Sequence, residues 1–207
     1  MTESQGIEIL KIYKQYHQVV KHMVIELETD DGEFPVEVLN EIRAILNHLA
    51  KCYLLDEEKP EGYQSLLDIQ IHDAKSHLKR AIFDCYKYSC ISVEDYYSDF
   101  CKRMKHVDLG VIDNGEFSVT LSKKYSSARC SLKTAKNDEQ DSMSASSFDT
   151  IFDLYKNAYE AYDDVRKYID ESLEKIERAR HKQAISWWVS IGFGIVGVIS
   201  LIVSLLK

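Results

Sequence analysis

Glycine and proline are scarce in this chain, and its cysteines form no recognisable motif. Of 207 residues only eight are Gly and two are Pro, and three of the glycines lie close to the C-terminus. Because these residues are the main breakers of helices, we expect the rest of the chain to be mostly helical. Cys52, Cys85, Cys90, Cys101 and Cys130 include no C-x-x-C pair, which favours reduced thiols over a disulfide framework or a zinc site.

Motifs of common enzyme chemistry are absent as well. The sequence contains no Gly-rich phosphate loop, no nucleophile elbow and no H-E-x-x-H motif, so ordinary hydrolase, kinase or dehydrogenase chemistry has no support. The net charge of -8 argues against a general nucleic-acid-binding surface, although it leaves room for a local basic site. We therefore expect neither a cofactor nor a metal.

A long apolar segment is present at the C-terminal end. Ala184–Leu206 is a run of 23 residues without a charged side chain. As a helix this run reaches about 34 Å, against roughly 30 Å of hydrocarbon in a typical bilayer. The first residues are polar and charged, so we expect no secretory signal there. The sequence predicts a tail-anchored protein with one transmembrane helix over residues 184–206.

The flanks of this segment predict its orientation. Arg178, Arg180 and Lys182 precede it, whereas a single lysine follows it. Basic flanks remain on the cytoplasmic side, so we expect a single-pass membrane protein whose N-terminal domain is cytoplasmic. Trp187 and Trp188 lie about one turn inside the segment, where indole rings favour the level of the lipid headgroups. These five residues form the predicted interfacial anchor.

Three amphipathic helices are predicted within residues 1–112, which we interpret as a helical bundle domain. Apolar residues recur there at steps of three or four, the period of a helix packed on one face. The predicted seams are Ile9, Ile12, Tyr16, Val19, Met23 and Leu27; then Leu39, Ile42, Leu46, Leu49 and Tyr53 after Pro35; and then Leu67, Ile71, Ala74, Leu78, Ala81 and Cys85.

Residues 113–147 lose this periodicity and are rich in Ser, Lys, Asp and Asn. Such a composition buries too little apolar surface to offset the entropy of ordering, so we expect a flexible polar loop. The alternating pattern over residues 116–122 is also compatible with a short β-hairpin.

Residues 148–183 again show a helical seam, and no breaker separates them from the apolar segment. The seam comprises Ile151, Tyr155, Ala158, Tyr162, Val165, Ile169, Leu173 and Ile176. This amphipathic helix either completes the bundle or pairs with other copies in a stalk, and its tyrosines favour the bundle. The predicted fold is thus all-α: a bundle of four long helices that continues into one C-terminal transmembrane helix.

Two residues of the second predicted helix could carry chemistry. Arg43 and His48 have the spacing R-x4-H, and the next helix carries the segment His77-Leu-Lys-Arg80-Ala-Ile-Phe-Asp84. Over roughly residues 7–110 and the last helix, the chain resembles HEPN-type domains, a helical-bundle family of prokaryotic ribonucleases and immune or toxin effectors. The resemblance implies a symmetric dimer in which Arg43 holds an RNA phosphodiester and His48 exchanges protons, which makes both residues catalytic candidates. The same spacing also occurs on the solvated flanks of ordinary helices, and that alternative stays open.

The third predicted helix carries further polar residues. His72 and His77 are five residues apart, whereas metal ligands on one helix face prefer steps of three or four, so we expect no metal there. A strip on one face of this helix comprises Asp73, His77, Arg80, Asp84 and Lys87. This strip suits either a binding surface or a solvated face with internal salt bridges.

Small residues line one side of the predicted transmembrane helix. They are Ser186, Ser190, Gly194, Gly197, Ser200 and Ser204, at steps of four, four, three, three and four. Such a face lets helix backbones approach closely, so we expect it to mediate self-association in lipid. Four or more copies would place the stripe around a pore, whereas a dimer would bury it.

Three functions are compatible with these observations. The first is a homo-oligomer in membrane lipid that perturbs the membrane or forms a pore, for which the resemblance to HEPN-type effectors implies a role in bacterial stress or antiphage defence. The second is a membrane-tethered, metal-independent HEPN-type endoribonuclease that acts on RNA through Arg43 and His48. The third is a non-catalytic adaptor that holds a protein partner at the membrane.

Overall fold

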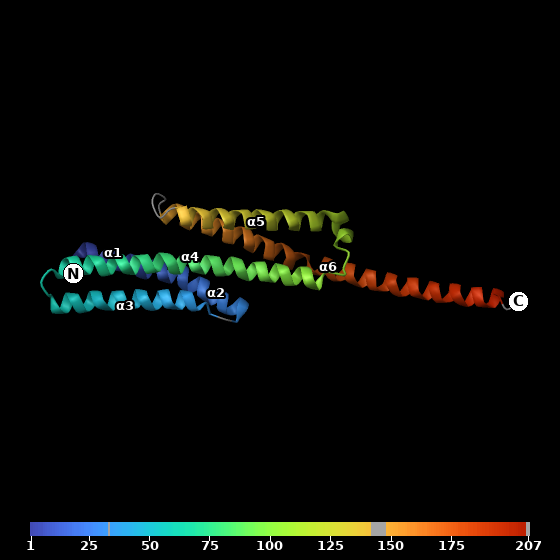
Figure 1. Cartoon of the computed structure of the whole chain (residues 1–207), viewed down its shortest axis with the longest axis horizontal. Coiled ribbons are helices and arrows are strands. Elements are labelled where there is room, and N and C mark those ends of the chain that lie inside the picture. The colour runs from blue at the N-terminus through green and yellow to red at the C-terminus, as the bar shows by residue number, and fades with distance from the viewer. Residues whose placement is uncertain (33, 142–147, 206–207) are drawn as a thin grey trace.

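The protein is an elongated bundle of long helices (Figure 1). The computed structural model describes residues 1–32, 34–141 and 148–205, with the side chains of 31, 141 and 198–205 outside this description. Within these ranges the chain is helical and contains no strand. The prediction of an all-α helical bundle is therefore confirmed.

The helices follow one another with short connections. Their bounds are α1 Glu3–Gln15, the π-helical turn η1 Tyr16–Val20, α2 Lys21–Asp31, α3 Val36–Glu58, α4 Tyr63–Arg103, the short 3-10 segment η2 Leu109–Gly115, α5 Glu116–Asp141 and α6 Phe148–Leu205. Because α1, η1 and α2 run on without a break, they form one helix with a bulge in its middle. Together with α3, α4, α5 and α6 this makes five long helices in the described residues, one more than the four predicted.

Local sequence signals set several helix ends. At the start of α1 the Gln5 amide donates to Thr2 Oγ1 at 3.3 Å, and the Thr2 amide donates to Gln5 Oε1 at 2.9 Å. This reciprocal pair satisfies two backbone donors that a helix start leaves open. Gly32, with φ of 69°, ends α2 in the left-handed region that glycine adopts without strain. Pro35 then caps α3 from an extended conformation.

Helix α4 is the centre of the bundle. It packs against α1, α2 and α3 on one side and against α6 on the other, while α5 covers α6 from outside. The predicted α4 seam is confirmed, because all six of its members, Leu67, Ile71, Ala74, Leu78, Ala81 and Cys85, are buried. The tyrosines of α6 extend this core, with the Tyr155 ring stacked on Phe83 at a centroid distance of 5.2 Å. Residues 148–183 of the last predicted helix therefore complete the bundle and do not form a separate stalk.

The flexible loop predicted for residues 113–147 is wrong over its described part. Residues 116–141 form helix α5, so the alternative of a hairpin over 116–122 is wrong too. The helix has a buried seam that the abundant Ser and Lys concealed, composed of Phe117, Leu121, Ala128, Leu132 and Ala135. Small alanines suffice here because α5 lies close against α6. Residues 142–147 lie outside the described residues.

The buried face of α3 matches the prediction in part. Leu49 is buried as predicted and Ile42 packs against the core, but the other buried residues are Val38, Ile45 and Cys52. The predicted Leu39, Leu46 and Tyr53, each one residue further on, are 51%, 56% and 54% exposed. Both sets have helical spacing, so periodicity alone could not choose between them. The set with the β-branched residues and the cysteine packs on α4, which leaves an apolar stripe on the surface of α3.

Candidate functional site

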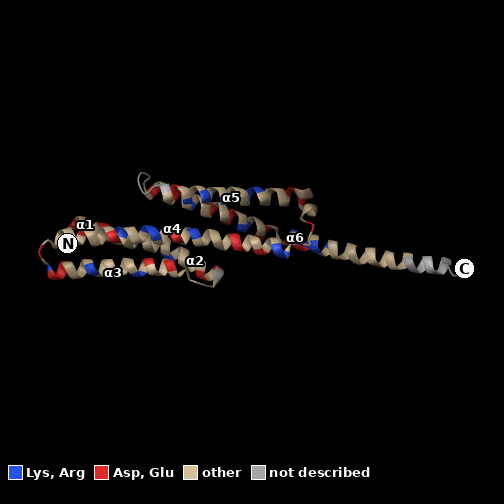
Figure 2. Ribbon diagram, in the orientation of Figure 1, with Lys and Arg blue, Asp and Glu red and all other residues tan. Residues whose placement is uncertain are grey.

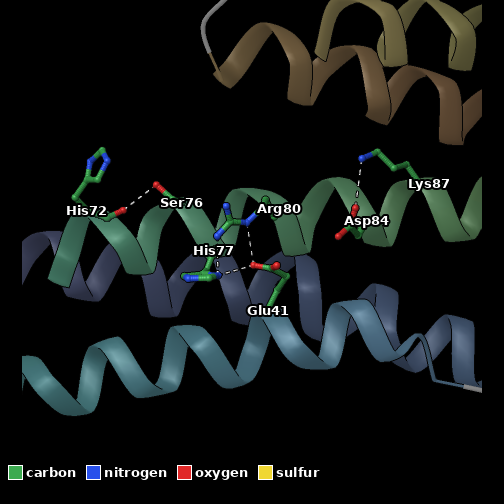
Figure 3. A network of polar contacts seen from close by, with 7 residues as sticks. All are labelled: Glu41, His72, Ser76, His77, Arg80, Asp84 and Lys87. Carbon is green, nitrogen blue, oxygen red and sulfur yellow. Dashed lines mark hydrogen bonds and ion pairs between the residues drawn. The ribbon is translucent and has the colours of Figure 1, made fainter. Parts of the chain in front are cut away.

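A cluster of ionisable side chains joins α3 to α4 (Figure 3). The Glu41 carboxylate of α3 accepts from Arg80 Nε at 3.1 Å and lies 2.6 Å from His77 Nδ1. An Arg80 terminal nitrogen is also 2.8 Å from His77 Nδ1. When Nδ1 carries a proton it donates to Glu41, and when it carries none it accepts from Arg80, so the tautomer of His77 decides which of the two bonds forms.

His48 lies beside this group and completes the cluster. Its ring stacks on that of His77 at a centroid distance of 5.2 Å, and its Nδ1 is 2.8 Å from Gln70 Oε1. Asp73 is 4.0 Å from the same nitrogen. Imidazole is the side chain most often used for proton transfer in proteins, so two stacked imidazoles with carboxylates nearby suit acid–base chemistry at a half-buried position.

The predicted partner of His48 is elsewhere. Five residues along a helix turn the chain by about 140°, so Arg43 and His48 project from different sides of α3. Arg43 is exposed and has no hydrogen bond or ion pair with any described residue. Within one chain His48 thus contacts His77, which in turn contacts Arg80, and His48 is not paired with Arg43. Sequence reasoning missed Glu41 as the residue that links His77 to Arg80, although it lies seven residues before His48.

The strip predicted on α4 divides between two neighbours. His77 and Arg80 contact α3, as described above, while Lys87 bonds to Asp84 at 3.3 Å and to Glu139 of α5 at 3.0 Å. Burial raises the pKa of Asp84, an effect that outweighs the adjacent Lys87. His72 points away from His77 (Figure 3), and the described part of the chain holds no group of His, Cys, Asp and Glu placed to bind a metal ion.

Polar bonds from α6 tyrosines tie this helix to each of its neighbours. The Tyr155 hydroxyl donates to Glu139 of α5, Tyr159 donates to Glu26 of α2 at 2.6 Å, and Tyr162 donates to Glu94 of α4 at 2.5 Å. The three tyrosines are four and three residues apart, so they form one row. Sequence reasoning assigned them to packing and missed the hydroxyl bonds, because the carboxylates come from distant parts of the chain.

Gln183 is the last residue of α6 with a bond to another part of the described bundle, and beyond it the helix continues alone (Figure 1). The Gln183 side chain accepts from the Asp108 amide and donates to the His106 carbonyl, both at 2.9 Å. Beyond it, Trp187, Trp188 and Phe193 are 61%, 67% and 75% exposed. No described side chain after Gln183 bonds to the bundle, so an apolar helix projects without a partner.

The predicted interfacial and oligomerisation residues lie around this exit. Arg178 pairs with Glu174 and Arg180 lies 3.7 Å from Glu177, both on the surface of α6, and Lys182 is exposed. Ser186, Ser190, Gly194 and Gly197 are exposed on the projecting helix, and a Cβ atom on either glycine would meet nothing within 4 Å. Ser200 and Ser204 have side chains outside the described residues.

No helix in the described part of the chain is long and apolar enough to cross a membrane. The predicted span over residues 184–206 extends beyond the described side chains, which end at Gly197.

Comparisons of the chain with protein-family models, curated proteins and solved structures find no match.

Proposed function

We propose that this protein is a membrane-anchored helical bundle whose projecting helix self-associates in the bilayer and perturbs the membrane. The observation that carries this proposal is the exposed apolar part of α6 after Gln183. A helix that has no charged side chain and exposes large apolar residues is stable only when something apolar surrounds it, and lipid meets that need over its full circumference. The resemblance to HEPN-type domains is the basis for proposing a role in bacterial stress or antiphage defence.

The flanks of the projecting helix support the same proposal. The basic residues Arg178, Arg180 and Lys182 lie where anionic headgroups would meet the end of the bundle, and Trp187 and Trp188 follow directly. Both indole rings are exposed and form an edge-to-face pair with centroids 5.4 Å apart. Such a pair suits the polar boundary of a bilayer, where tryptophan rings are enriched.

The continuity of α6 suggests how the bundle and the membrane would communicate. The row formed by Tyr155, Tyr159 and Tyr162 bonds α6 to three other helices, and the same helix runs on through Gln183. Any partner that shifts α6 within the bundle would rotate or tilt the projecting part as well. This gives the bundle control over how the membrane segments of several copies meet.

Glycine variants in the projecting helix test self-association. Gly194→Leu or Gly197→Leu places a bulky side chain on the stripe of small residues, so we expect weaker oligomers in detergent and less membrane depolarisation on overexpression. Gly192→Leu is the matched control, because Gly192 lies on the opposite side of the helix and also has open space around it. Equal oligomerisation and depolarisation in all three variants would contradict the proposal.

A second candidate is RNA cleavage, favoured by the stacked His48 and His77 with Arg80 at their side. In this case the two imidazoles would exchange protons, and Arg80, or Arg43 of a second copy, would hold the phosphate. We expect a His48→Ala variant to lose RNA cleavage if this function is correct. Intact RNA after incubation with concentrated wild-type protein would count against it.

A third candidate is an adaptor that holds a protein partner at the membrane. The exposed apolar stripe of Leu39, Leu46 and Tyr53 on α3 is the observation that favours a protein contact there. An adaptor would keep its function when an unrelated transmembrane helix replaces residues 184–206, whereas a membrane effector that depends on the stripe of small residues would lose it.

A further inference from the structure

A hollow of about 610 Å³, open to solvent, is lined mostly by α5, with Glu94 contributed by α4. Among the contacts that join α4 to α5, Lys87 pairs with Glu139 at 3.0 Å, and the rings of Tyr97 and Tyr125 stack with their centroids 3.9 Å apart. Tyr162 of α6 lines the hollow from within the bundle.

The walls of this hollow are basic although the chain as a whole is acidic. Between Phe117 and Asn137, α5 has no acidic residue, and Figure 2 shows its blue positions between red ones at the two ends. Arg129, Lys133 and Lys136 line the hollow on the α5 side. Their spacing of four and three residues places them in one row along the helix.

Most of this positive charge is not neutralised. Glu94 is the one carboxylate among the residues that line the hollow, where it accepts from Tyr162 and lies 3.7 Å from Arg129. Lys133 and Lys136 form no ion pair with any residue that the structure describes. The hollow therefore has room for an anion with more than one negative charge.

We propose that this hollow binds a soluble small molecule with phosphate groups, of the nucleotide class, through Arg129, Lys133 and Lys136. Ammonium and guanidinium groups are the side chains that bind phosphate oxygens most strongly. The amides of Asn137 and Gln140, which also line the hollow, can bond to the polar groups of a sugar or base.

The position of the hollow favours a soluble ligand over a lipid headgroup. About 33 Å of helix separates Tyr162 from the start of the apolar segment at Ala184. That length is several times the Debye length of about 8 Å at physiological salt, so headgroups around the projecting helix would not reach the hollow. This site goes beyond the proposed membrane function, and either can fail without the other.

Calorimetric titration of the full chain in detergent micelles, with ATP and inorganic pyrophosphate as probes, tests the proposal. We expect saturable binding that weakens as ionic strength rises, and a loss of about tenfold or more in affinity for the double variant Lys133→Glu/Lys136→Glu. The control is Lys51→Glu/Lys123→Glu, which makes the same change of charge at two exposed lysines outside the hollow. If the first variant does not fold, Lys133→Gln/Lys136→Gln removes the charges without reversing them.

Two results would overturn the proposal. One is the absence of saturable binding of both probes to the wild-type chain, or equal affinity in the hollow and control variants. The other is binding that depends on Lys133 and Lys136 but occurs only with anionic lipid vesicles or with RNA, which would assign these lysines to a lipid or nucleic-acid surface.

Discussion

Replacing Tyr162 by phenylalanine tests whether the tyrosine hydroxyls hold α6 in the bundle. Tyr162 is 0% exposed, and its hydroxyl donates to Glu94 at 2.5 Å. Phenylalanine fills the same space, so no cavity forms and the loss is that of one bond to a charged acceptor, about 1.5–3 kcal/mol. Because the Glu94 side chain is 33% exposed, water can replace part of this bond, and we expect a value near the lower limit, about 1.5 kcal/mol.

Thermal unfolding followed by circular dichroism measures this loss on the chain that ends at Gln183. For a domain of this size, about 1.5 kcal/mol corresponds to a decrease of roughly 3–6 °C in Tm. Tyr53→Phe is the matched control, because Tyr53 is 54% exposed and its hydroxyl has no partner among the described residues. Combining Tyr162→Phe with Glu94→Gln should cost less than the sum of the two single changes. A decrease in Tm no larger than that of the control would refute the role of the hydroxyl.

Three further predictions concern the bundle. Burial and a bond to Asp170 raise the pKa of Tyr96 to about 12, and burial raises the pKa of Cys85 to about 12, from ordinary values of 10.0 and 9.0. The contribution of these groups to the free energy of unfolding is therefore fully present below about pH 9 and is lost as the pH rises toward 12. Denaturant titration at stepped pH measures this loss, and a free energy of unfolding that does not change with pH would contradict the burial of these groups. A maleimide should label Cys101 and Cys130, which are exposed, and leave the three buried cysteines unmodified until the protein unfolds. Mass spectrometry of folded and unfolded samples counts the adducts, and more than two adducts on the folded chain would contradict the burial of the other three cysteines. Ser127→Pro lies in the middle of α5 and should destabilise the bundle by about 3 kcal/mol, whereas a loop would tolerate it, and thermal unfolding separates the two outcomes.

The sequence was sufficient for helices whose seams combine large apolar residues. The α4 seam from Leu67 to Cys85 is buried as predicted, since its alternative faces are charged. Helix α6 matches its predicted seam with one exception, because Leu173 is 45% exposed while Ser172 is buried. A prediction from uniform helical spacing misses this one-residue shift of the buried face, which depends on where η2 and α5 contact the end of α6.

Helix α5 shows where composition misleads. Its seam from Phe117 to Ala135 has the correct spacing, yet the small alanines and the many serines and lysines gave the segment the composition of a loop. The surrounding helices make this segment helical, because an amphipathic helix of low propensity becomes stable when its face is buried. Its basic surface, which lines the hollow beside α4, was missed for the same reason.

The candidate polar sites depended on contacts that no local pattern contains. His48 and His77 are on different helices, and their stacking follows from the register of α3 against α4. The R-x4-H spacing predicted Arg43 as the partner of His48, but the helical rotation between positions 43 and 48 places the two side chains on different sides of α3. Sequence reasoning could name His48 as a candidate, whereas its partners Gln70, Asp73 and His77 required the structure.

Membrane extraction is the most direct test of the central claim, that the projecting part of α6 anchors the bundle in a bilayer. The full chain and the chain that ends at Gln183 are expressed in bacteria, and their membranes are washed with alkaline carbonate to release peripheral proteins. Our account predicts that the full chain remains in the washed membranes and that the shorter chain is found in the supernatant. Release of the full chain by carbonate, or its recovery without membranes, would contradict the account.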